Sequence, residues 1–339
     1  MIIFDSQYIF YTKKYQNSEE GLQQLTGNKN FNPQLPFSRQ DFLTTKPKKQ
    51  QGMSISGFQP KLQLIINENQ FNSIDQQGNY ILKPSPDNYP FLAENEHATM
   101  RVMAELGFEV PVNRLFPFAS ESAEKELAFV IKRFDRDKHN NPIHQEQLDG
   151  AMNIQEKYGK IKSDDEQYIS YERVAKFILQ HTEKNLALQR ELFRRIVYAY
   201  LLANNDLHLR NFSLLYPKNS VPKLAPVYDF VSVTPYNEAF NSALFALPLL
   251  KKEEGNQTLA HGFNTQYGKY IGDDFVEFGE NIGLNKRVIL QKLIPEIIKE
   301  KVESIYQRSF MPKTHIAIVL KTYHKRLQLL KILDEPSLS

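Results

Sequence analysis

Short apolar segments bounded by polar and turn-forming residues predict strands in the first third of the chain. Strands are expected at residues 63–67, at residues 80–83, which follow a Gly-Asn turn and stop before a proline, and at residues 127–134. Residues 94–106 carry apolar side chains at helical spacing and are followed by a glycine, so they predict a helix. Several strands with one helix indicate a small, mainly β N-terminal lobe over residues 1–134.

The rest of the chain, residues 135–339, has the pattern of a helical lobe. Apolar residues in the segment 186–203 recur at spacings of one, three and four, which is typical of an amphipathic helix. Further helices are expected at residues 281–309 and 313–333. A β-rich lobe followed by a mainly helical lobe predicts an α+β, bilobal, protein-kinase-like fold, in which ATP lies between the lobes.

The most informative motif is Asn-Asp-Leu-His-Leu-Arg-Asn at residues 205–211, followed by Asp229. Protein kinases use an Asp-x-x-x-x-Asn loop and a later Asp to take a proton from the attacking hydroxyl and to hold magnesium-ATP. This spacing predicts Asp206 as the catalytic base and Asn211 and Asp229 as magnesium ligands. The alternative is that the three residues only shape turns and end a strand.

A hairpin supports the convergence of these residues. Residues 212–216 and 223–228 read as its two strands, and the residues between them are rich in Pro, Asn and Ser. If the turn centres near Ser220, Asn211 and Asp229 fall opposite each other. Two oxygen ligands would then face one point, as a hard cation requires.

Other segments have the character of a phosphate site. Small residues in the loop 53–61 would let backbone N–H groups approach phosphate oxygens, and the alternative is a flexible serine loop. Lys83 ends a strand and Glu96 lies on the next helix, as in the kinase pair that grips phosphate, although both could be surface residues. His208 could contact a phosphate or orient the catalytic loop.

Composition and charge exclude several classes of protein. The chain of 339 residues has 41% apolar and 24% charged residues and a net charge of +3, so bulk charge does not argue for nucleic-acid binding. It has no Cys, which excludes disulfides, thiolate metal sites and cysteine catalysis. Asp5 interrupts the first apolar run, so no secretory signal is expected, and residues 243–250 are too short to span a bilayer.

Together these motifs resemble the HipA family of serine/threonine kinase toxins from bacterial toxin–antitoxin systems. The sequences Ser-Ile-Ser-Gly-Phe-Gln-Pro-Lys at 54–61, Ile-Leu-Lys-Pro at 81–84 and Lys-Arg-Phe-Asp-Arg at 132–136 look like the family's phosphate loop, ATP-lysine strand and hinge. The resemblance implies ATP and Mg²⁺ as cofactors, with Asp206 as the catalytic residue and Asn211 and Asp229 as metal ligands. The nucleotide-binding residues that it implies are Ser56, Gly57, Phe58, Gln59, Lys61, Lys83, Lys132, Phe134, His208, Asn211, Tyr228 and Asp229.

Within this family the chain looks most like the short HipT kinases of three-component HipBST systems. Only 53 residues precede Ser54, and Ser56 follows as a second serine. The resemblance implies autophosphorylation at Ser54 or Ser56, an aminoacyl-tRNA synthetase substrate such as tryptophanyl-tRNA synthetase, a small HipS-like antitoxin and a DNA-binding HipB-like partner. It also implies the bacterial cytoplasm, while delivery into another cell stays open.

Three other functions compete with this interpretation. A small-molecule kinase shares the catalytic hairpin, and a non-catalytic binding protein could keep the kinase scaffold. A metal-dependent nuclease could use Asp206, His208 and Asp229, but the near-neutral charge and the ATP-lysine strand disfavour it.

Overall fold

The structure is a computed structural model of the whole chain, which divides into two compact units. Unit 1 comprises Met1–Pro142 and Ile305–Pro312, and unit 2 comprises Ile143–Ser304 and Lys313–Ser339. The residues that the structure describes are 18–45, 60–120, 126–159, 169–236, 243–256, 258–300 and 302–334.

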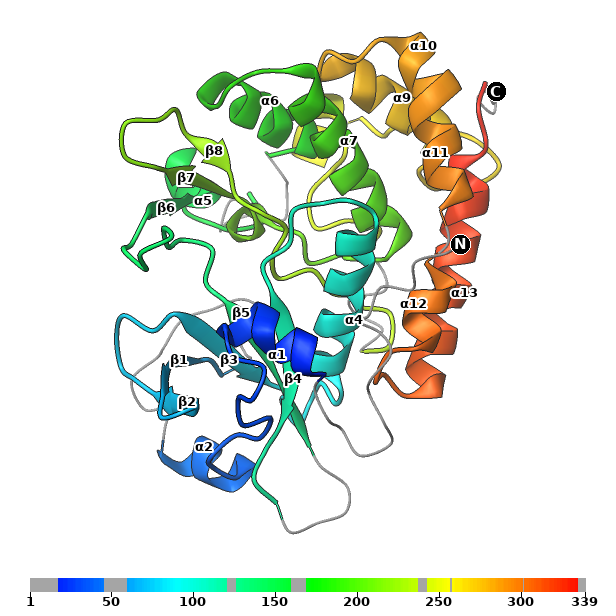
Figure 1. Ribbon diagram of the computed structural model, residues 1–339. Coiled ribbons are helices and arrows are strands. Elements are labelled where there is room, and N and C mark those ends of the chain that lie inside the picture. Colours follow the sequence, from blue (N-terminus) through cyan, green and yellow to red (C-terminus); the bar gives the residue numbers. More distant parts are fainter. Residues whose placement is uncertain are drawn as a thin grey trace, which may run out of the picture. The chain divides into compact units, whose positions relative to one another are not determined.

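Unit 1 is built on a five-stranded antiparallel sheet with the strand order β2-β1-β3-β5-β4 (Figure 1). The strands are β1 (Leu62–Asn67), β2 (Gln70–Ser73), β3 (Tyr80–Pro84), β4 (Asn113–Pro117) and β5 (Leu127–Lys132). The helices of this part of the chain are α1 (Glu19–Thr26), α2 (Arg39–Thr45) and α4 (Leu92–Glu105).

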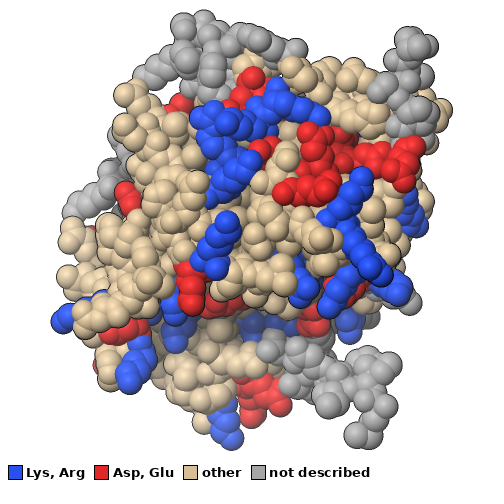
Figure 2. Space-filling view, turned by 90° about the horizontal axis from the view of Figure 1, so that it is seen from above, with Lys and Arg blue, Asp and Glu red and all other residues tan. Residues whose placement is uncertain are grey.

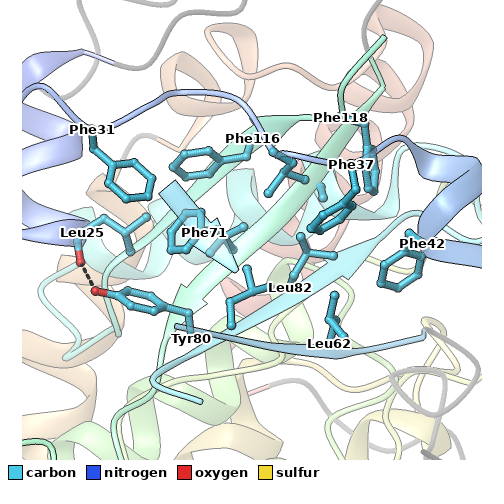
Figure 3. Close-up of a cluster of buried hydrophobic side chains, with 14 of the residues drawn as sticks. Leu25, Phe31, Phe37, Phe42, Leu62, Phe71, Tyr80, Leu82, Phe116 and Phe118 are labelled. Carbon is cyan, nitrogen blue, oxygen red and sulfur yellow. Dashed lines mark hydrogen bonds between the residues drawn. The ribbon is translucent and has the colours of Figure 1, made fainter. Parts of the chain in front are cut away.

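One face of this sheet carries a core of aromatic and aliphatic side chains (Figure 3). Phe71 lies at its centre, with ring centroids 4.8 Å from Phe31, 5.0 Å from Phe116 and 5.1 Å from Tyr80 in edge-to-face contacts. The Tyr80 hydroxyl donates to the Leu25 carbonyl of α1 at 3.1 Å. This face therefore binds the N-terminal helices through a dry, specific core.

The opposite face of the sheet carries Lys83, the residue that the sequence predicts to contact phosphate. Side chains alternate between the two faces of a strand, so Lys83 and Phe129 lie on the face opposite Leu82 and Val130. Helix α4 packs on β3, β4 and β5 at this face, and Gly107, with φ +82°, allows the chain to turn after it.

Unit 2 combines a small sheet with helices. The sheet has the strand order β6-β7-β8, from β6 (His144–Gln147), β7 (Ser213–Tyr216) and β8 (Lys223–Leu224). The larger helices are α6 (Tyr171–His181), α7 (Leu186–Leu201), α9 (Gly272–Asn281) and α13 (Lys313–Leu330), which begins just after the segment 305–312 of unit 1. The shorter helices are α5 (Leu148–Ala151), α10 (Lys286–Val288) and α11 (Ile294–Lys299), with 3₁₀ or π turns η3 (Leu209–Asn211), η4 (Lys251–Asn256), η5 (His261–Asn264) and η6 (Ile289–Leu293). Helix α12 (Glu303–Gln307) begins in unit 2 and continues into the segment 305–312 of unit 1.

Helix α7 is the central element of unit 2. The Asn185 side chain caps its first turn by accepting the Leu188 N–H at 2.9 Å. The helix packs against α6, α9 and α13, and its last turn, from Tyr198 to Leu201, has no exposed residue. It is therefore a rigid support for the predicted catalytic loop, residues 205–211, which follows it.

Most of the predicted elements are confirmed, with shifted ends. Strands β1, β3 and β5 and helices α4, α7 and α13 lie where the sequence placed them. The single helix predicted at 281–309 is wrong, because Gly283 has φ +96° and Glu300 has an extended backbone, so the segment forms several short helices. The predictions did not include β2 and β4.

The predicted hairpin register is also wrong. The second strand was expected at 223–228 but ends at Leu224, two residues before a proline that cannot donate to the ladder. Leu214 pairs with Leu224 and Leu215 with Lys223, so the turn centres near Asn219 rather than Ser220. Continued to its open end, this register places Val227, and not Asp229, opposite Asn211.

Candidate active site

The catalytic loop begins where α7 ends. Ala203 has φ +54°, a left-handed conformation that turns the chain, and its carbonyl accepts from the Val233 N–H at 3.0 Å. The following residues lead to Asp206 and then to turn η3. At that turn the His208 N–H donates to Asn211 Oδ1 at 3.1 Å, and the Asn211 N–H donates to the His208 carbonyl at 2.9 Å. The two bonds fix the geometry of the Asp-x-x-x-x-Asn motif.

Buried polar side chains hold this loop from other helices of unit 2. The Tyr171 hydroxyl of α6 donates to the Leu207 carbonyl at 2.7 Å. The Arg326 guanidinium of α13 donates to the Tyr200 carbonyl at 2.5 Å and to Asn205 Oδ1 and the Leu244 carbonyl at 3.3 Å each. The loop is thus held by interactions that are remote in the sequence.

Asp206 has the electrostatics of a general base. The residue is only 5% exposed, and Oδ1 accepts a hydrogen bond from the Tyr158 hydroxyl at 2.7 Å. Burial raises the pKa of Asp206 to about 6, with a further contribution from the charge of Asp229. The Tyr158 hydrogen bond and the Lys157 charge oppose this increase. A carboxylate poised near neutral pH suits proton abstraction.

Asp229 lies close enough for its charge to act on both Asp206 and His208. It is half-buried and has φ +51°, a conformation that Asp tolerates better than most residues. The preceding Tyr228 donates its hydroxyl to the Arg210 carbonyl at 2.9 Å and also contacts Ser213 Oγ at 2.5 Å. These two hydrogen bonds connect the segment that contains Asp229 to the loop that contains Arg210.

The donor set fits a magnesium ion. Asn211 offers an amide oxygen and Asp229 a carboxylate, and Mg²⁺ prefers one or two such protein ligands completed by phosphate oxygens and water. Among the described residues no three His, Cys, Asp or Glu side chains gather as a metal site. The mutual repulsion of Asp206 and Asp229 is a second sign, because a cation would relieve it.

His208 lies beside Asp206 in this loop. It is 1% exposed, and burial, followed by the nearby charge of Lys157, lowers its pKa to about 3. Neither ring nitrogen has a hydrogen-bond partner within the described part of the chain, and Nε2 lies 4.0 Å from Asp206 Oδ1. Both expectations for His208, contact with a phosphate and orientation of the loop, stay predictions.

In unit 1, Lys83 and Glu96 form the pair that the sequence indicated. Lys83 Nζ lies 2.6 Å from Glu96 Oε1, and the side chains are 3% and 2% exposed. The ammonium also lies 5.6 Å from the centroid of the Phe129 ring. The alternatives of an edge lysine and a surface glutamate are therefore wrong.

The hinge segment is held by an ion cluster that the sequence did not indicate. Asp135 is buried between Arg133 and Arg136, and their hydrogen bonds and charges outweigh its burial and lower its pKa. The Lys132 N–H donates to the Val112 carbonyl at 2.9 Å, so this donor is not available to an adenine ring. Phe134 is half-buried and lies two residues after the end of β5, and its role in adenine binding stays a prediction.

Part of the predicted phosphate loop lies outside the described residues. This holds for Ser54, Ser56, Gly57, Phe58 and Gln59, and Lys61 is half-buried immediately before β1.

Sequence reasoning missed several residues that hold the site, above all Tyr158, Lys157, Tyr171 and Arg326. Each comes from a segment at least 30 residues away from its partner in the loop. An isolated Tyr, Lys or Arg carries no local signal of such a contact.

Charge and hydropathy of the described residues add two observations. Figure 2 shows basic and acidic groups side by side on the face it displays, so neither sign covers that face. No described helix has the length and apolar character needed to cross a membrane.

Comparisons with known proteins bear on this geometry. Residues 53–308 match the HipA-like C-terminal domain. A Haemophilus influenzae protein named "Putative kinase" is 75% identical over 323 residues, which cover 95% of this chain and 94% of that protein. The serine/threonine-protein kinase toxin HipA of Shewanella oneidensis is 26% identical over 273 residues, which cover 73% of this chain and 57% of that protein.

Two solved structures share the fold. A chain of the Shewanella oneidensis complex of HipA, HipB and operator DNA matches with a TM-score of 0.58 at 18% identity, over 83% of this chain and 65% of that chain. The Helicobacter pylori proinflammatory kinase CtkA matches with a TM-score of 0.51 at 17% identity, over 84% of this chain and 91% of that chain. The protein therefore has a kinase-like α+β fold, and it spans less than two thirds of the length of HipA.

Proposed function

The chain belongs to the HipA-like family of kinases, and on this premise we propose that it is a serine/threonine protein kinase that uses ATP. The observation that carries the proposal is the state of Asp206. This carboxylate is buried, has a pKa near neutrality, lies within electrostatic range of Asp229 and is held at the start of an Asp-x-x-x-x-Asn loop.

In the proposed reaction Asp206 accepts the proton of a protein hydroxyl. The hydroxyl oxygen bonds to the γ-phosphorus, the bond from that phosphorus to the β,γ-bridging oxygen breaks, and ADP leaves. Lys83, fixed by Glu96, offers its charge to the phosphates. Asn211 and Asp229 would hold Mg²⁺, whose charge offsets that of the phosphates when it is bound.

The biological role that we propose is that of a toxin in a toxin–antitoxin system. It rests on the relatives, because a HipA of Shewanella oneidensis is a serine/threonine-protein kinase toxin and occurs in a complex with HipB and operator DNA. We extend this to a HipT-like protein with an aminoacyl-tRNA synthetase substrate, a HipS-like antitoxin and a HipB-like partner. Autophosphorylation at Ser54 or Ser56 belongs to the same proposal.

Incubation of the purified chain with γ-labelled ATP and a bacterial lysate tests the function. We expect one labelled lysate protein, identified by mass spectrometry, and loss of the label in an Asp206→Asn variant. A parallel incubation with small hydroxyl compounds separates a protein kinase from a small-molecule kinase. Label that transfers only to small compounds, or persists in the variant, would overturn the proposal.

A further inference from the structure

A short segment that lies far from the catalytic loop in the sequence, Glu156-Lys157-Tyr158, packs against this loop. The Leu209 N–H of the loop donates to the Lys157 carbonyl at 3.0 Å. The Tyr158 N–H donates to Glu156 Oε2 at 2.7 Å, and the Tyr158 ring meets His208 edge-on at a centroid distance of 5.3 Å. Backbone and ring contacts together fix the position of Tyr158 relative to the loop.

The Tyr158 hydroxyl forms a hydrogen bond with one of the two carboxylate oxygens of Asp206. It donates to Oδ1 at 2.7 Å, whereas Oδ2 receives no hydrogen bond from any described residue. Burial, followed by the charge of Asp206, raises the pKa of Tyr158 well above its usual value, so the hydroxyl keeps its proton and stays a donor.

Lys157 places a positive charge beside the same pair. Its ammonium lies 4.5 Å from the centroid of the Tyr158 ring and is attracted by Asp206. Since His208 is neutral and enclosed, Lys157 is the cation of this segment that acts on the carboxylate of Asp206.

We propose that Tyr158 is a positioning residue for phosphoryl transfer, which holds Asp206 by Oδ1 so that Oδ2 is left for the acceptor hydroxyl. This inference rests on the proposed kinase function and deepens it. A carboxylate that can rotate spends part of its time in orientations that cannot accept the proton. Holding it in the productive orientation lowers the entropic cost of reaching the transition state. The opposite interpretation is that the Tyr158 hydroxyl occupies the place of the substrate hydroxyl and blocks it. Against this, Tyr158 bonds to Oδ1, and Oδ2 accepts no hydrogen bond from a described residue.

Tyr158→Phe separates the two readings, because it removes the hydroxyl and keeps the ring. The matched control is Tyr216→Phe. The Tyr216 hydroxyl, on β7, donates to Glu146 of β6 at 2.9 Å and does not contact Asp206. We expect Tyr158→Phe to lower kcat for transfer to the protein acceptor about 10- to 100-fold, with an unchanged KM for ATP. Tyr216→Phe should match the wild type.

Failure of the Tyr158 role and failure of the proposed kinase function give different results. An unchanged or increased kcat in Tyr158→Phe overturns the positioning role. So does a decrease in kcat that comes with an equally large increase in KM for ATP and a lower melting temperature, because that pattern reports a structural role. If Asp206→Asn keeps wild-type activity, the proposed function itself fails; if only Asp206→Asn is inactive, the function stands and the role of Tyr158 does not.

Discussion

The ammonium of Lys83 and the carboxylate of Glu96 lie 2.6 Å apart, on a strand and a helix of the same unit, with almost no exposure to solvent. Two charges removed from water in this way contribute little net stability, but each becomes costly when the other is removed. The pair therefore contributes more to the position of Lys83, which we propose as a phosphate contact, than to the stability of the fold.

Removal of one partner should destabilise the protein strongly. We expect Lys83→Met to cost about 3–5 kcal/mol in the free energy of unfolding, because Glu96 is left buried without its cation. The double variant Lys83→Met/Glu96→Leu should recover most of this loss and remain inactive. Urea unfolding and transfer of labelled phosphate measure the two effects.

A matched exposed pair serves as the control. Lys252 and Glu277 lie 2.6 Å apart with more than a third of each side chain exposed, and Lys252→Met should change stability by less than about 1 kcal/mol. A double variant that stays as unstable as Lys83→Met would argue that Lys83 stabilises the unit through other contacts.

The raised pKa of Asp206 predicts how activity and stability depend on pH. The base must be ionised, so the transfer rate should decrease as the pH falls through about 6. A carboxyl group whose folded pKa is raised contributes stability below its unfolded pKa and loses it as the pH rises through the folded value. Asp206→Asn should thus be inactive and yet more stable than the wild type at pH 7, by about 1–3 kcal/mol.

The stability difference should disappear below the ordinary pKa of an Asp, where the wild-type carboxyl is protonated in both states. Thermal melting of both proteins across this range measures it. The groups that act on Asp206 from the neighbouring elements are Tyr158, Lys157, Tyr171, His208 and Asp229. A wild type that is more stable than Asp206→Asn at pH 7 would contradict the electrostatic description.

Local sequence patterns predicted many elements of the fold and some residues of the candidate site. Helix α7 follows from its apolar spacing, and the Asp-x-x-x-x-Asn motif could be recognised because its members lie within six consecutive residues. Strand β4 could not be recognised, because its sequence Asn-Arg-Leu-Phe-Pro has only two consecutive apolar residues before the proline, although all five residues are buried. The position of Asp229 depends on where β8 ends, a tertiary result that the hairpin arithmetic misjudged.

Contacts of high sequence separation explain the remaining misses. Tyr158 and Asp206 are 48 residues apart, and Arg326 lies 121 residues from Asn205. A single polar residue in a loop or a helix gives no indication of such a partner, since its local environment in the sequence is that of a surface residue.

Asp229→Asn should separate metal binding from folding. Asn tolerates the left-handed backbone at this position, so the variant keeps the local conformation while it loses the charge that a hard cation requires. We expect the melting temperature to stay within a few degrees of the wild type and magnesium-dependent binding of ATP to be lost. Isothermal titration with ATP, with and without magnesium, measures this.

The matched variant for this experiment is Asp273→Asn, at the half-buried start of α9 in the same unit. It should bind magnesium-ATP like the wild type. Retention of magnesium-dependent binding in Asp229→Asn would remove Asp229 from the proposed metal site and leave Asn211 without its carboxylate partner.

Arg326 should be essential for the catalytic loop although it lies near the C-terminus. It is buried, its pKa is lowered to about 10 by burial, and its donors satisfy two carbonyls and the Asn205 side chain. We expect Arg326→Met to cost about 2–4 kcal/mol, because these acceptors are left buried and unsatisfied. Arg326→Lys should recover only part of this, since one ammonium cannot reproduce the fork of a guanidinium.

The exposed Arg287 provides the comparison, and Arg287→Met should change stability by no more than about 0.5 kcal/mol. Denaturant unfolding gives the free energies, and the transfer rate at a temperature where every variant is folded gives the effect on the loop. If the folded Arg326→Met protein transfers phosphate at the wild-type rate, the guanidinium stabilises the unit without positioning Asp206. If the rate decreases with the KM for ATP unchanged, α13 belongs to the support of the catalytic base.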